Sequence, residues 1–210
     1  MASCTKDEVD QLLELPVKLG TLDMDGLELV GKNNSTVTVR TCREWQEAKE
    51  KGFHALTTFA MKMESYFNRA YGIINAVAQA NVADKSYISE PRVGVVDLNL
   101  FPVSILPGGM SDEDWVEIEE AASSGTTVQD WVEAGKVKIK SVSQHAIKLE
   151  YNGMGQYLWE LMCADFNQDG IEDILLYQSN YAIGGTYGYR STMTVTRLGS
   201  SEHFQLINGE

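Results

Sequence analysis

The stretch Asp165-Phe-Asn-Gln-Asp-Gly-Ile-Glu-Asp173 carries oxygen-bearing side chains at alternating positions and a single glycine. Gly170 stands at position six, where the chain must reverse sharply and a residue without Cβ adopts a positive φ at little cost. Calcium is a hard cation that binds six to eight oxygen atoms in flexible geometry. The spacing therefore predicts a calcium loop with five protein ligands: Asp165, Asn167, Asp169, the carbonyl of Ile171 and Asp173.

The residues around this stretch argue against a helical calcium-binding hand. An EF-hand needs a bidentate Glu at position twelve, which is Leu176 here. The flanking runs Tyr157–Ala164 and Ile174–Gln178 are short, apolar and aromatic, which is typical of strands. The segment resembles the Asp-x-Asn-x-Asp-Gly-x-x-Asp loops of FG-GAP-type and EF-hand-like calcium proteins of bacteria. That resemblance implies a calcium loop inside a β-hairpin. The alternative is a solvated turn without metal.

Composition and charge restrict the classes of function. The chain has 210 residues, of which 43% are hydrophobic and 22% charged, as in an ordinary globular protein. It has no apolar run of membrane-spanning length. The formal net charge of −13 repels nucleic-acid phosphates and favours cations or a basic protein partner. Solubility alone also explains such a charge.

The three cysteines lack metal-binding or redox-pair spacing. Small residues precede Cys4, as they do at the acylated cysteine of a bacterial lipoprotein. If Cys4 carried a lipid, Cys42 and Cys163 would remain as an even pair, able to form a disulfide in an oxidising compartment. These observations predict a periplasmic or cell-envelope protein, with Cys4 as the candidate residue for a lipid anchor to the membrane. Three reduced thiols in a cytosolic protein are the alternative.

We expect one α+β domain over residues 1–210, with an N-terminal part (5–90) and a C-terminal sheet part (91–210). The N-terminal part should contain a short helix at 5–15 and a hairpin from 22–30 and 36–40. A capping box at Thr41 and Glu44 predicts the start of a long central helix whose apolar stripe, from Leu56 to Val77, makes it deeply buried.

The C-terminal part should be an antiparallel meandering sheet preceded by two short acidic helices. Val and Leu residues predict a strand over 92–100, and capping boxes place the helices after Ser111 and Thr127. Period-two patterns at 137–139 and 147–151 predict a hairpin. The calcium hairpin and two closing strands, at 192–198 and 204–207, complete the sheet.

The sequence contains no catalytic signature, so no catalytic residue is assigned. The stretch 177–190 is rich in Tyr, Gly, Ser and Asn, a composition that is common at contact surfaces. The alternative is a glycine-bearing β-turn whose tyrosines pack on the edge of the sheet. We therefore expect a non-enzymatic, calcium-binding envelope protein that binds a basic protein, as an inhibitor or a toxin-immunity protein does. The alternative is a periplasmic hydrolase. The predicted partner-binding residues are Tyr177, Tyr181, Tyr187, Tyr189, Arg190, Glu117 and Glu120.

Overall fold

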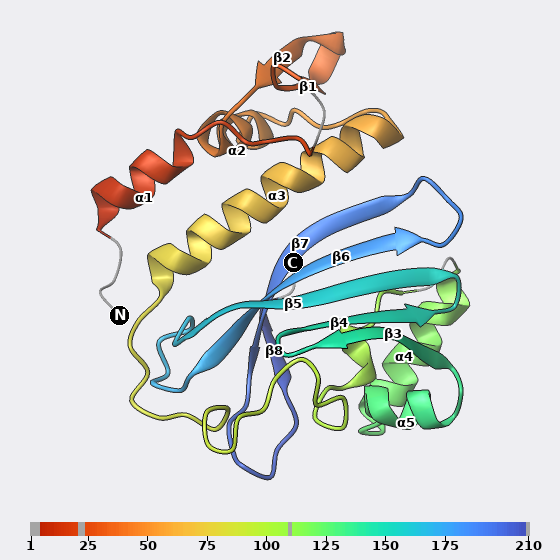
Figure 1. The fold of residues 1–210 in the computed structure, drawn as a ribbon. Helices are drawn as coiled ribbons and strands as arrows, with labels where there is room; N and C mark the ends of the chain where they lie inside the picture. The colour runs from red at the N-terminus through yellow and green to blue at the C-terminus, as the bar shows by residue number, and fades with distance from the viewer. Residues whose placement is uncertain (1–4, 21–23, 109–110, 209–210) are drawn as a thin grey trace. The chain divides into compact units, whose positions relative to one another are not determined.

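A computed structural model describes residues 5–20, 24–108 and 111–208. The chain contains both helices and antiparallel sheets, so the predicted α+β class is confirmed (Figure 1). The contacts divide the described residues into two compact units. We call residues 5–79 with 189–192 the helical unit, and residues 80–188 with 193–208 the sheet unit.

The helical unit begins with a helix, a small hairpin and two further helices. Its elements are α1 (Lys6–Leu13), β1 (Leu27–Val30), η1 (Lys32–Asn34), β2 (Thr36–Val39), α2 (Cys42–Glu50) and α3 (Thr58–Gln79). Thr41 and Glu44 form the predicted capping box at the start of α2. The core gathers apolar side chains from the strands and helices that follow α1, among them Leu29, Val39, Trp45 and Phe67.

The segment predicted as one long central helix from Thr41 onward is divided in two. α2 ends at Glu50, Gly52 adopts a φ of 83° and α3 begins at Thr58. Because a left-handed glycine ends an α-helix, the capping box at Thr41 starts α2 alone. The buried residues of α3 are Met63, Ser65 and Phe67. The helix is therefore less buried than its apolar content predicts.

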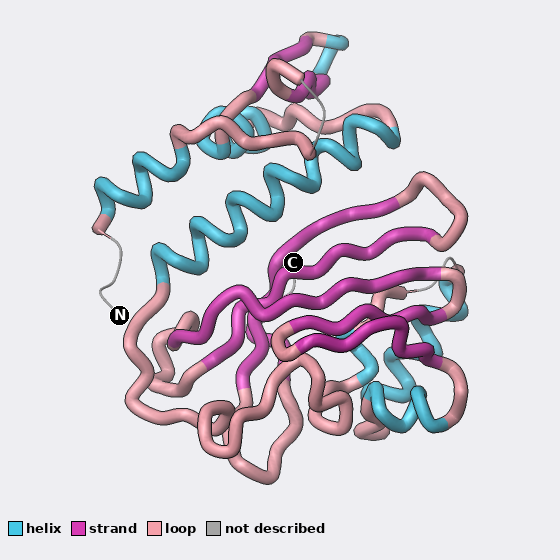
Figure 2. Tube along the Cα trace, in the orientation of Figure 1, coloured by secondary structure: helices cyan, strands magenta, loops and turns pink. Residues whose placement is uncertain are grey.

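The sheet unit starts with a long segment that is almost entirely loop (Figure 2). This segment contains η2 (Val103–Ile105), and α4 (Asp112–Ser123) and α5 (Val128–Glu133) follow it. The strands are β3 (Val137–Ser143), β4 (Ala146–Tyr151), β5 (Met154–Ala164), β6 (Asp173–Ala182), β7 (Gly188–Thr196) and β8 (Gln205–Asn208). They form one sheet in sequence order, β3-β4-β5-β6-β7-β8. The predicted meander is confirmed.

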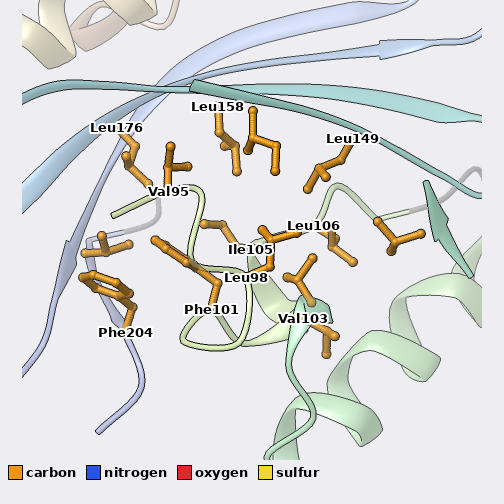
Figure 3. Packing of buried hydrophobic residues seen from close by; sticks show 14 of the residues in the cluster. Val95, Leu98, Phe101, Val103, Ile105, Leu106, Leu149, Leu158, Leu176 and Phe204 are labelled. Carbon is orange, nitrogen blue, oxygen red and sulfur yellow. The ribbon is translucent and has the colours of Figure 1, made fainter. Parts of the chain in front are cut away.

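One face of this sheet carries the larger core. Leu149, Leu158 and Leu176 come from three successive strands and meet Val95, Leu98 and Phe101 of the long loop (Figure 3). Ile118 of α4 and Trp131 of α5 belong to the same cluster. The two acidic helices and the loop therefore cover one face of the sheet.

The predicted strand over 92–100 is absent, because these residues form turns. Val95 and Leu98 are 0% and 4% exposed. The apolar residues of 92–100 are therefore explained by burial in a packed loop and not by a strand. The backbone turns back on itself here: Asp97 N–H donates to Gly94 O and Leu100 N–H donates to Asp97 O. Periodicity alone does not separate a buried loop of this kind from a strand.

The first strand of the sheet, β3, is an edge strand. Val137 is its buried residue, and the other six are exposed. The pairing of β3 with β4 shifts register between Ile139 and Ser141, which leaves Lys140 outside the register. Lys140 Nζ lies 3.2 Å from the Glu150 carboxylate of β4.

Candidate functional site

The predicted calcium loop joins β5 to β6. Ala164 and Asp173 are the last paired residues of β5 and β6, and the residues between them form the turn of the hairpin. Two of these residues have a left-handed backbone, Gln168 with a φ of 65° and Gly170 with a φ of 83°. The glycine is therefore required by the turn, as the sequence pattern predicts.

Asp165 organises the loop from inside. Its side chain is almost fully buried, and the residue is 3% exposed. Oδ1 accepts the N–H groups of Gln168 (2.7 Å) and Asp169 (3.3 Å), and Oδ2 accepts that of Gly170 (3.0 Å). These hydrogen bonds hold the backbone of the next five residues in a turn around the carboxylate.

Asn167 and Asp169 lie on the exposed side of the same loop. Asn167 Nδ2 donates to Asp169 Oδ2 at 2.9 Å, and Asp169 N–H donates to Asn167 Oδ1 at 3.1 Å. Asp169 Oδ1 accepts the Ile171 N–H at 2.8 Å. These oxygens are engaged in local turns, so a cation would compete with short hydrogen bonds for them.

Asp173 is the fully buried member of the set, with 0% exposure. Oδ2 accepts the Phe166 N–H at 3.0 Å, whereas the buried Oδ1 and the buried Thr196 Oγ1 both lack a hydrogen bond of normal length and angle. Burial raises the pKa of this carboxyl; the Phe166 N–H and the nearby Thr196 hydroxyl lower it, while Asp169 and Asp165 raise it further. A buried carboxylate oxygen without a donor is costly, and a cation beside it would offset that cost.

The predicted ligands all lie in this loop, but their oxygen atoms are not arranged around one common position. Within the described residues, no group of three or more His, Cys, Asp or Glu side chains is arranged to hold a metal ion. The donor set itself, carboxylates and an amide oxygen, suits a hard cation such as calcium. The unpartnered Oδ1 of Asp173 is the feature that a bound cation would explain.

The predicted contact loop at 177–190 is mostly two paired strands. Tyr177 and Tyr181 belong to β6, and Tyr189 and Arg190 belong to β7. Tyr181 packs against Gly155 of β5, and the Lys148 ammonium lies 5.5 Å from the centre of its ring. The turn 183–187 is exposed. These tyrosines are therefore strand residues, and the adaptable loop is shorter than predicted.

Tyr187 and Ile183 mark the exposed tip of this hairpin. Tyr187 is 51% exposed and Ile183 is 48% exposed, next to Gly184 with a φ of 77°. Arg190 lies elsewhere, with its guanidinium 4.6 Å from the centre of the Tyr66 ring in the helical unit, to which residue 190 also belongs. Of the aromatic residues predicted to bind a partner, Tyr187 is the one most open to solvent.

The two acidic residues predicted to attract a partner differ in their surroundings. Glu117 of α4 accepts hydrogen bonds from the Lys136 ammonium at 2.6 Å and the Tyr151 hydroxyl at 3.0 Å. Lys136, and then Tyr151, lower the pKa of this carboxyl. Glu120, on the same helix, is exposed. Glu117 therefore ties α4 to the sheet, and Glu120 remains available for long-range attraction.

A buried carboxylate, Glu160 of β5, is a feature that no sequence pattern indicated. Its side chain is 4% exposed and pairs with the Arg92 guanidinium. Oε1 accepts the Val95 N–H at 2.7 Å, and Oε2 lies 3.0 Å from Nδ1 of His145 in the β3–β4 turn. A Cβ at Gly94 would overlap Oε1. Glu160 thus holds the long loop and a hairpin turn to the middle of the sheet.

This cluster has the orienting half of a catalytic dyad. A carboxylate that holds one ring nitrogen of a histidine fixes the tautomer and leaves the other nitrogen for chemistry. The nearby Cys163 thiol is not an activated nucleophile, because burial raises its pKa to about 11. In the described residues, no Ser, Thr or Cys side chain is hydrogen-bonded to His145. We assign the cluster a structural role.

The predicted disulfide between Cys42 and Cys163 is absent from the structure, where both residues are free thiols. Cys42 is the first residue of α2 and packs in the helical unit, whereas Cys163 lies on β5 against the core of the sheet unit. Burial raises the pKa of the Cys42 thiol to about 11 as well. Cys42 is thus buried within the helical unit, and Cys163 is partly buried against the core of the sheet unit. Cys4, the predicted lipid-anchor residue, lies outside the described residues.

Comparisons with protein-family models, with curated proteins and with solved structures find no match to this chain. Its function therefore has to be inferred from its own residues. Among the ranges that the structure describes, no helix is both long and apolar enough to cross a membrane.

Proposed function

We propose that this chain is a non-enzymatic calcium-binding protein whose loop 165–173 takes one ion. The side chains of Asp165, Asn167, Asp169 and Asp173 and the carbonyl of Ile171 are the ligands, with water completing the shell. A bound ion would supply positive charge and no chemical step. Its role is to fix the β5–β6 hairpin.

The observation that carries this proposal is the unpartnered Oδ1 of Asp173. A buried polar atom without a partner usually marks strain, a functional site or a missing ion. Three aspartates share this short loop, and the charges of Asp169 and Asp165 each raise the pKa of the Asp173 carboxyl. A cation would satisfy Oδ1 and relieve the repulsion among the three carboxylates at the same time.

Calcium should raise the stability of the protein. Because the loop exists only in the folded state, calcium at a hundred times its dissociation constant would add about 2.7 kcal/mol to the free energy of unfolding. For a chain of this size, that corresponds to a rise in melting temperature of about 5–10 °C. Thermal denaturation with calcium and with a chelator measures the change.

Two variants make this test specific. Asp169→Ala should abolish the calcium-dependent rise, whereas Glu119→Ala, which removes an exposed carboxylate from α4, should leave it intact. Equal melting temperatures with calcium and chelator, together with no bound metal in elemental analysis of the untreated protein, would show that the loop is only a turn.

The proposal extends to a compartment. Modules that work outside the cytoplasm bind calcium with dissociation constants of about 10⁻⁴–10⁻³ M, which suits a loop whose oxygens also make local hydrogen bonds. We therefore assign the chain to the bacterial cell envelope, with Cys4 as the point of lipid attachment. Lipid analysis of protein from the native host tests this assignment.

A second part of the proposal concerns a protein partner. The exposed tip at Ile183 and Tyr187 gives a small apolar surface, and the net charge of −13 would speed encounter with a basic protein. An inhibitor or a toxin-immunity protein has these properties. Glu120 contributes to the attraction, and Tyr187 to the contacts that slow dissociation.

Tyr187→Ala should mainly increase the dissociation rate of a basic partner. The expected cost is about 1–4 kcal/mol, the range of aromatic residues at the centre of interfaces. Leu198→Ala removes a side chain that is 40% exposed elsewhere and is the matched control. Glu120→Gln should instead lower the association rate and its salt dependence. Binding kinetics on the immobilised partner measure both rates, and rates in Tyr187→Ala and Glu120→Gln that equal those of the Leu198→Ala control would remove this surface from the proposal.

The alternative function, a periplasmic hydrolase with a structural calcium, has one supporting observation, the contact between His145 and Glu160. It requires a nucleophile or an activated water beside the second ring nitrogen of His145. Loss of a measured hydrolytic activity in His145→Ala, with the fold retained, would favour this function over the binding protein.

A further inference from the structure

The calcium loop supports a second segment of the sheet unit, residues 81–89, which follows α3. Asn81 and Asp165 exchange backbone hydrogen bonds of 2.8 and 3.1 Å. Gly170 O accepts the N–H groups of both Asp84 (2.9 Å) and Lys85 (3.0 Å). Both ends of the predicted metal loop are therefore bonded to this segment through the backbone.

Side chains of the same two segments reinforce this attachment. The hydroxyls of Ser86 and Ser89 each donate to Glu172 Oε2 at 2.6 Å. Glu172 N–H donates to Lys85 O at 2.8 Å. Glu172 lies inside the loop but is not one of the predicted ligands. It connects the loop to the segment without taking part in cation binding.

The first half of the segment buries little of its own surface. Asn81, Val82, Asp84, Lys85 and Ser86 are exposed, and the first buried residue is Ile88. Segments with few buried contacts open at low free energy, and their order follows that of the element they are bonded to. For residues 81–86, that element is the calcium loop.

We propose that a divalent cation in loop 165–173 controls the order of segment 81–89, and that Glu172, Ser86 and Ser89 are the positioning residues that couple the two. The inference rests on the proposed calcium function. Without a cation, three carboxylates on a short loop repel one another, the loop opens, and the hydrogen bonds that Asp165 O and Gly170 O accept from the segment are lost. With the cation, the loop closes and the segment is ordered.

Coupling of this kind is reciprocal. If calcium orders the segment, then loosening the segment must weaken calcium binding, by up to the same factor, even though no ligand is changed. The double variant Ser86→Ala/Ser89→Ala removes the hydroxyls that hold Glu172 and leaves every predicted ligand in place. Its calcium affinity should fall by about fivefold or more. Ser123→Ala, an exposed serine of α4, is the matched control.

The test combines calorimetric titration of the full chain with calcium and amide hydrogen exchange with calcium or chelator. Exchange at Asn81, Asp84 and Lys85 should slow by about tenfold or more with calcium, while exchange in β3 and β4 stays unchanged. A wild-type chain that binds no calcium overturns both the proposed function and this inference. Calcium binding with unchanged exchange at 81–85 and wild-type affinity in the double variant overturns the inference alone.

Discussion

Phe101→Ala should destabilise the protein severely, by about 4 kcal/mol in the free energy of unfolding. Phe101 is 1% exposed, and its ring is stacked on that of Phe204, with centroids 4.4 Å apart (Figure 3). It belongs to the long loop, yet its backbone also bonds to α5 through Val128 N–H. The truncation therefore leaves a cavity where the long loop, α5 and Phe204, which precedes β8, meet.

Urea denaturation followed by tryptophan fluorescence measures this loss. Phe59→Ala is the matched control, because Phe59 is 54% exposed and its truncation should cost less than about 1 kcal/mol. Equal losses in the two variants would show that the loop does not form part of the core. Retention of the far-ultraviolet circular dichroism spectrum of the wild type would show that both variants fold.

Glu160→Ala should cost about 3 kcal/mol, the lower end of the range for breaking a buried ion pair. The lower end applies because Arg92 and His145 have side chains 43% and 46% exposed, so solvent screens the charges left behind. The buried Val95 N–H also loses its acceptor, which adds a desolvation cost.

Glu160→Gln separates the charge from the hydrogen bonds. Glutamine keeps an oxygen for the Val95 N–H and loses the charge that faces Arg92, so the expected loss is smaller, about 1.5 kcal/mol. Glu133→Ala, at an exposed position of α5, should change the stability by less than about 0.5 kcal/mol. A Glu160→Ala variant as stable as the wild type would mean that the cluster carries no structural role.

Sequence patterns predicted correctly those elements that depend on interactions between residues close together in the chain. The capping boxes at Thr41, Ser111 and Thr127 start helices as expected, because both partners of each box lie within one turn. Gly170 adopts the left-handed backbone that its place in the loop requires. The meander was predictable for the same reason, because each strand pairs with its neighbour in the chain.

The features that were missed depend on residues far apart in the chain. Glu160 meets Arg92 and Val95 across 68 and 65 positions, and no pattern around any of them indicates that contact. The composition of the stretch 177–190 left a contact loop and a turn with packed tyrosines as alternatives, and the pairing of β6 with β5, which continues to Ala182, shows that most of the stretch is strand. Most of these tyrosines thus lie in strands, for which tyrosine has a high propensity.

The outer strand of the sheet, β3, pairs with β4 on one side, and on its other side no strand of the described residues covers its backbone groups. Such an edge is a template on which another chain could add and start a fibre. Lys138 and Lys140 place charge on this strand, and the irregularity at Lys140 interrupts the regular spacing that a docking strand would need. The lysine charges and the register shift both disfavour pairing of β3 with a strand of another molecule. Ile139 and Val142 are exposed on this strand, and the two features lower the tendency of their apolar side chains to recruit another chain.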